Sequence, residues 1–294
     1  MELQLHQLRR RTQRQHQSQG AYAIIDSGLG QWYGLGIDQC IAGHSFPVAL
    51  QSCVATRACD TRFRHCYVMV MDAQIDHITG LLMLREGKKK LNLYCTDSVW
   101  DDLNHGLPLA KVLSHYCGVE HHEITGLSAD KTRFAPIEVP GIAGIRFHPL
   151  PLKSKAPPYS PHRANPQPGD NNGLLIENLE TGKTLFYAPG LGEIEPHVRE
   201  AMQKADCVLV DGTVWTGDEM ITLGLTQKTA ADMGHLQLSG PGGMIEVLDS
   251  VGQRRKVLIH INNTNPILNE DSAEHASLAK HGIEVAFDGM EIKV

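Results

Sequence analysis

The chain has 294 residues, of which 41% are hydrophobic and 20% are charged, as in an ordinary soluble globular protein. Its formal net charge of −6 leaves no basic excess that could neutralise phosphates, so we expect no nucleic-acid partner. No apolar run approaches the roughly 20 residues that a membrane helix needs, and no apolar core follows the basic N-terminus as in a secretory signal. We therefore expect a cytoplasmic protein with no membrane span.

Residues 1–66 differ in character from the rest of the chain. The stretch 11–20 is polar, rich in glutamine and without periodicity, which is typical of poorly ordered segments. Two apolar runs, residues 21–25 and 47–50, are candidates for short strands. We therefore divide the chain into an atypical, poorly ordered N-terminal segment, residues 1–66, and one domain, residues 67–294.

From residue 67 onward, apolar strand patterns alternate with helical patterns and Gly/Pro turns, which favours a layered α/β fold. Strands are expected at residues 67–71, 91–95, 132–139, 144–150, 174–177, 184–187, 207–210, 257–259 and 283–286. Helices are expected at residues 98–113, 196–204, 242–248 and 272–280.

Three candidate metal ligands stand at the ends of apolar strands. Asp76 and His77 follow the strand 67–71, and Thr79-Gly80 behind them permits the sharp turn that would bring both to one metal. His260 ends another buried strand, the place where α/β folds hold ligands. Two histidines and one carboxylate form a facial triad with open positions, which fits Fe(II) and O₂ chemistry and which zinc also accepts. The alternative for Asp76 and His77 is an ordinary surface turn.

A second candidate pair is Asp211, which closes the strand 207–210, and His235, which precedes a Gly/Pro turn. A carboxylate that orients a histidine outside the metal shell is a standard arrangement for proton transfer, so we assign both residues to catalysis. The alternative is that His235 interacts with the carboxyl end of the preceding helix.

The proline-rich stretch 152–170 is long for a loop in a compact domain, so we expect a lid or a binding loop. We assign its residues Tyr159, His162 and Arg163 to substrate binding, because Arg163 could bind a carboxylate. His162 is also a candidate for a degenerate metal ligand. The alternative is that these are ordinary exposed loop residues.

Seven segments carry a resemblance to a known family: DAQIDHITGLLMLRE (72–86), APPYSPHR (156–163), PGDNNGLL (168–175), LFYAPGLG (185–192), GPGGMIEVLD (240–249), KVLIHINNTNPIL (256–268) and VAFDGM (285–290). From about residue 71 to residue 294 the chain resembles the coenzyme PQQ synthesis protein B family of the metallo-β-lactamase superfamily. The resemblance implies an α/β, metallo-β-lactamase-like four-layer αβ/βα sandwich, with a metal between the edges of two central sheets.

In this superfamily, residues 72–77 stand in the frame of the motif His-x-His-x-Asp-His, whose two halves serve two metals. Asp72 and Gln74 replace the first two histidines, and Pro189 stands where a bridging aspartate is usual. The resemblance therefore implies one divalent metal, Fe(II) or zinc, held by Asp76, His77 and His260. Asp211 and His235 resemble the carboxylate and the proton-donating histidine of tRNase Z-like relatives.

The resemblance implies a role in the biosynthesis of pyrroloquinoline quinone (PQQ). The implied activity is that of a non-haem iron oxidoreductase, which oxidises or hydroxylates the tyrosine moiety of a PQQ precursor cross-linked to glutamate. The alternative is a carrier that takes PQQ or its precursor to the periplasm, and metal-dependent turnover distinguishes the two. A residual metallo-hydrolase is a third reading, weakened by the loss of both leading histidines. The sequence allows a homodimer.

The first part of the chain departs from the family pattern. Family members start with a strand, a Gly-rich turn and a structural zinc site of the form Cys-x-Cys-x-x-Cys, and none of these is recognisable in residues 1–66. The only remnant is Arg11-Thr12-Gln13. We expect a truncated or frame-shifted reading of this part, with the first strands of the sandwich incomplete or replaced and the structural zinc absent.

Overall fold

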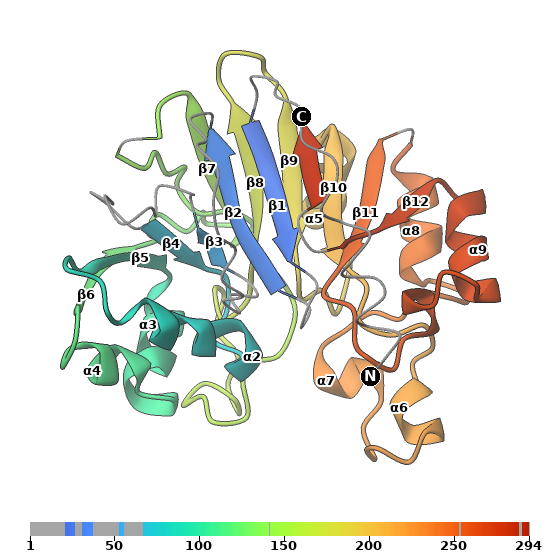
Figure 1. Cartoon of the computed structure of the whole chain (residues 1–294), viewed down its shortest axis with the longest axis horizontal. Coiled ribbons are helices and arrows are strands. Elements are labelled where there is room, and N and C mark those ends of the chain that lie inside the picture. The colour runs from blue at the N-terminus through green and yellow to red at the C-terminus, as the bar shows by residue number, and fades with distance from the viewer. Residues whose placement is uncertain are drawn as a thin grey trace.

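The structure, a computed structural model, describes residues 21–26, 31–37, 53–55 and 67–293, without residues 141, 253, 288 and 289. A six-stranded sheet faces two smaller sheets, and helices cover the outer sides (Figure 1). This is the α/β sandwich expected from the sequence.

The larger sheet has six strands in the order β12-β11-β10-β9-β8-β7. Strands β9 to β12 are parallel, whereas β7 and β8 run antiparallel to their neighbours. The bounds are β7 (Ile145–Pro151), β8 (Asn172–Asn178), β9 (Thr184–Ala188), β10 (Cys207–Asp211), β11 (Arg255–Ile259) and β12 (Ile283–Val285).

The facing strands form a four-stranded sheet, β3-β4-β5-β6, and a three-stranded sheet, β13-β1-β2. Strands β1 and β3 come from residues before 67, but they pair with β13 and β4 from the rest of the chain. The bounds are β1 (Ala21–Asp26), β2 (Gln31–Ile37), β3 (Cys53–Ala55), β4 (Tyr67–Val70), β5 (Leu91–Cys95), β6 (Val119–Glu123) and β13 (Met290–Lys293). The predicted strand 21–25 is confirmed as β1. The predicted strand 47–50 and the polar stretch 11–20 lie outside the described residues.

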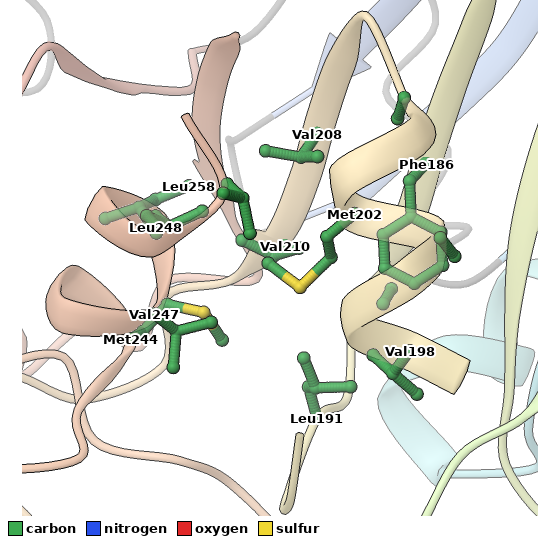
Figure 2. Packing of buried hydrophobic residues seen from close by; sticks show 14 of the residues in the cluster. Phe186, Leu191, Val198, Met202, Val208, Val210, Met244, Val247, Leu248 and Leu258 are labelled. Atoms are coloured by element: carbon green, nitrogen blue, oxygen red, sulfur yellow. The ribbon is translucent and has the colours of Figure 1, made fainter. Parts of the chain in front are cut away.

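Alternating side chains build three apolar layers. In β10, Leu209 points into the core between the sheets, whereas Val208 and Val210 pack on the outer side against helices. In β4, Met69 joins the central core and Val68 packs against the helices of the other side. Figure 2 shows the outer layer on the six-stranded sheet, where side chains of α5 (Pro196–Lys204) and α8 (Met244–Ser250) meet those of the strands.

The other helical segments are short, and those between β4 and β6 pack on the outer face of the four-stranded sheet. They are α2 (Ile75–Ile78), η1 (Thr79–Leu84), α3 (Asp97–Asp101), η2 (Asp102–Gly106), α4 (Leu109–Leu113), α6 (Glu219–Thr222), α7 (Ala230–Met233), η3 (Pro266–Leu268) and α9 (Ala273–Lys280). In the part of the chain that the structure describes, no helix is long and apolar enough to cross a membrane.

One strand prediction was wrong. Residues 132–139 form no strand and make only an isolated bridge between Ile137 and Phe147 of β7. Pro136 lies in the middle of this stretch and has no amide hydrogen to donate to a ladder, which explains the interruption.

Candidate metal centre

Asp76 and His77 lie in α2, directly after the turn that follows β4. The Gln74 amide donates to Asp72 Oδ1 over 2.9 Å, and the His77 amide donates to the Gln74 carbonyl over 2.9 Å. The chain therefore turns before the two ligands, through the Asp72 carboxylate, and the prediction that Thr79-Gly80 makes the turn was wrong. The turn buries the His77 ring and leaves the Asp76 side chain 57% exposed at the rim.

His260 follows β11 in a left-handed backbone conformation, with a φ of 53°. This conformation costs a residue with a side chain roughly 1 kcal/mol or more. Backbone bonds from the neighbouring strand connection fix it on both sides: the Gly212 amide donates to the Ile259 carbonyl over 2.7 Å, and the Asn262 amide donates to the Thr213 carbonyl over 3.1 Å. The surrounding fold thus holds His260 in a strained position at the end of its strand.

His77 connects the two halves of the site. Its Nδ1–H donates to Asp72 Oδ1 over 2.6 Å, and its Nε2 lies 2.8 Å from Nε2 of His260. The two imidazole rings meet edge to face, with centroids 4.9 Å apart. Both histidines therefore present the same nitrogen, Nε2, to one position.

A second set of hydrogen bonds supports His260 from behind. Its Nδ1–H donates to Thr213 Oγ1 over 2.7 Å, and the Thr213 hydroxyl donates to Asp211 Oδ1 over 2.5 Å. The other oxygen of Asp211 accepts from His235 Nδ1–H over 2.6 Å. The predicted pair of Asp211 and His235 is thus in direct contact. Thr213 connects this pair to the candidate ligand His260.

The pKa values follow from these contacts. Burial by itself lowers the pKa of His77, but the charge and the hydrogen bond of Asp72 outweigh it and raise this pKa to about 9. Burial lowers the pKa of His260 to about 4, and the charges of His77 and His235 add to the fall. The pKa of His235 is raised. Burial by itself lowers this pKa, but the charge and the hydrogen bond of Asp211 outweigh the effect of burial.

The donor atoms of Asp76, His77 and His260 fit a single metal ion. All three lie within 4.8 Å of one another, with Asp76 Oδ2 3.8 Å from His77 Nε2 and 4.0 Å from His260 Nε2. Ligand atoms bound at about 2.1 Å to one zinc ion are about 3.0–3.4 Å apart. The gap is small, and the exposed Asp76 side chain has room to close it.

Asp211, His235 and His260 form a second group within 4.8 Å. However, Asp211 is fully buried, and its oxygens also accept from the Leu191 amide and the Thr213 amide, each over 2.9 Å. Because its acceptor positions are occupied by protein donors, we assign Asp211 to support of the histidines. The carboxyl end of α7 also interacts with His235, whose amide donates to the Ala230 carbonyl over 3.0 Å.

Two of the predicted substrate residues are engaged with nearby backbone. The Tyr159 hydroxyl donates to the Ala73 carbonyl, and the Arg163 guanidinium donates to the Ala156 carbonyl of its own loop. Burial raises the pKa of Tyr159. Tyr159 thus ties the loop to the turn that carries the ligands, and neither residue belongs to the metal-binding groups.

His162 faces a different part of the surface. Its Nε2 lies 3.0 Å from Asp101 Oδ2 of α3. It lines a groove of about 850 Å³ together with residues such as Trp100 and Phe134, and this groove contains none of the candidate metal ligands. The structure therefore does not bring His162 to the metal position.

Sequence reasoning missed Thr213 and the use of Asp72 as a partner of His77. Thr213 follows Asp211 by two residues at the end of β10, and that position was the available signal. Pro189, directly after β9, is buried and has no side-chain atom that could bind a metal.

The fold and the site define a protein of the metallo-β-lactamase superfamily. The family described as Beta-lactamase superfamily domain matches residues 53–261. Coenzyme PQQ synthesis protein B of Methylococcus capsulatus is 57% identical over 225 residues, which cover 76% of this chain and 72% of that protein. The chain belongs to the coenzyme PQQ synthesis protein B family.

Two further relatives extend the comparison. Coenzyme PQQ synthesis protein B of Ectopseudomonas mendocina is 49% identical over 280 residues, which cover 95% of this chain and 88% of that protein. That similarity therefore includes most of residues 1–66. The crystal structure of Zn²⁺-bound PqqB from Methylobacterium extorquens has a TM-score of 0.65 and 30% identity, and covers 78% of this chain and 73% of that chain.

Proposed function

We propose that this protein oxidises or hydroxylates the tyrosine moiety of the PQQ precursor, with one Fe(II) held by Asp76, His77 and His260. The observation that carries the proposal is the convergence of two histidine Nε2 atoms and one carboxylate on a single position. Three protein ligands leave positions open for O₂ and for a substrate oxygen, and this ligand set is typical of non-haem iron oxygenases. Family membership and the zinc in the M. extorquens relative support the pathway and the metal site.

The bound metal would supply the O₂-dependent oxidation of the ring. The protein side chains supply position and protons. Because His235 donates from Nδ1 to Asp211, its Nε2 is the atom left to give a proton to, or take one from, the substrate. The loop that carries Tyr159, His162 and Arg163 would cover the substrate. The hydrogen bond from Tyr159 to the Ala73 carbonyl would hold this loop beside the turn that precedes Asp76 and His77.

The test is O₂ uptake with the tyrosine-derived precursor after anaerobic loading with Fe(II), together with elemental analysis. We expect one equivalent of metal per chain and oxygen consumption that depends on both iron and precursor. His77→Ala and His260→Ala should lose metal and turnover together.

Two outcomes would contradict the proposal. Tight binding of PQQ without any turnover would favour the carrier. Two metal equivalents, both lost in His77→Ala, would overturn the single-metal site.

A further inference from the structure

We propose that Asp72, which stands at a histidine position of the two-metal motif, is a positioning residue that fixes the imidazole of His77 for a single metal. The inference rests on the metal site proposed above but not on the oxidation chemistry. It gives a role to a residue that the motif alone presents as a lost ligand.

The geometry places Asp72 on the far side of the His77 ring. Asp72 Oδ1 accepts from Nδ1, whereas the opposite nitrogen, Nε2, faces His260 at 2.8 Å. The Asp72 carboxylate therefore does not share the metal position, and the group of convergent donors contains Asp76 instead. A histidine ligand whose second nitrogen donates to a carboxylate has a fixed tautomer, a fixed ring orientation and greater basicity.

Burial makes this pairing strong. Asp72 and His77 are each only 2% exposed, so neither group is screened by water. Removing Asp72 would take away the carboxylate oxygen that accepts from the buried Nδ1–H of His77, and the loss of a buried hydrogen-bond partner is unfavourable. The Gln74 amide also donates to Asp72 Oδ1 over 2.9 Å, so the carboxylate cannot rotate without losing two bonds.

Gln74 gives a matched control from the same motif. Its side chain points elsewhere, with Nε2 donating to the Lys155 carbonyl over 2.8 Å. Gln74 also stands at a histidine position of the motif, but its side chain contacts the loop of residues 152–170 and not the His77 ring. Gln74→Ala should therefore leave metal affinity unchanged.

The experiment is a competition titration of Zn²⁺ against a chromophoric chelator on the full chain. We expect Asp72→Ala to weaken zinc binding by 10- to 100-fold, the usual effect of removing such a partner, and Asp72→Asn to weaken it by less, because the amide oxygen still accepts from Nδ1–H. In the zinc-loaded protein with ¹⁵N-labelled histidine, the His77 Nδ1 proton should be sharp in the wild type and in Asp72→Asn, and broadened by exchange in Asp72→Ala. The isosteric Asp72→Asn keeps the test valid if the alanine variant folds poorly.

The outcomes distinguish the positioning role of Asp72 from the metal site itself. If His77→Ala abolishes binding but Asp72→Ala binds zinc like the wild type, the positioning role is wrong and the metal site stands. If Asp72→Asn loses as much affinity as His77→Ala, Asp72 is a ligand. If His77→Ala leaves zinc affinity unchanged, the metal site and the positioning role are both wrong.

Discussion

His235 and His260 lie with stacked rings, their centroids 5.1 Å apart, yet their nitrogens have different partners. His260 Nε2 meets His77, whereas His235 is held by Asp211 and stays outside the group formed with Asp76. We therefore expect His235→Ala to keep metal occupancy within a few-fold of the wild type and to lower turnover by about 10²- to 10⁴-fold, as for the loss of a proton-transfer group.

His260→Ala is the comparison variant, because it should lose both metal and turnover. Metal content and O₂ uptake measured on the same samples decide the point. Equal loss of metal in the two variants would place His235 among the ligands and remove its proposed role.

At the scale of elements, the loop of residues 152–170 joins both halves of the site. Its Lys155 carbonyl accepts from Gln74 of the ligand turn, and its Ser154 hydroxyl donates to the Gly234 carbonyl beside His235 over 2.9 Å. The far end of the loop packs on η2, where Asp102 is fully buried. Burial raises the pKa of Asp102 to about 6.

This raised pKa makes the stability of the folded protein depend on pH. An unfolded aspartate titrates near pH 3.9, so between about pH 4 and pH 6 the folded state binds a proton that the unfolded state lacks. The free energy of unfolding therefore falls as the pH rises through this window. We expect Asp102→Asn, which has no charge to bury, to raise Tm by about 2–6 °C at pH 7 and by much less at pH 4. Thermal unfolding at both pH values is the measurement.

The control for this variant is Asp97→Asn, which removes an exposed carboxylate of the adjacent helix α3. A gain of equal size in the control, or a gain in Asp102→Asn that does not change with pH, would show that burial of Asp102 is not the cause.

The same scale shows what the sequence could predict. Strands with continuous apolar runs, such as β10, were predicted within a residue, because two-sided burial leaves a plain signal. The strand β6 was missed, since its residues Val119–Glu123 are polar and partly exposed at the sheet edge. His260 was recognisable because it directly follows a buried strand, and Asp76 and His77 because they come shortly after another one, although they lie in α2. The role of Asp72 as the partner of His77 was not recognisable, because the motif shows that a histidine has been replaced but not what the new residue contacts.

At the scale of the whole molecule, the metal position lies between the two sheets. His77 follows β4 of one sheet and His260 follows β11 of the other, 183 residues further along the chain. No spacing rule connects residues so far apart, and only the facing of the two sheets brings them within 2.8 Å. A metal bound there would link the two sheets, and the unfolded chain would not hold these ligands together.

We therefore expect metal to stabilise the entire domain. A ligand at 100 times its Kd adds about 2.7 kcal/mol to the free energy of unfolding, which corresponds to a rise in Tm of roughly 5 °C or more. The measurement is thermal unfolding with increasing Zn²⁺, compared with the same series on His77→Ala. The Tm of the wild type should rise with the logarithm of the zinc concentration. The Tm of the variant should not change, because the histidine ligand that follows β4 is gone. An equal rise in both proteins would mean that zinc acts at another place and that the two sheets are not joined through His77.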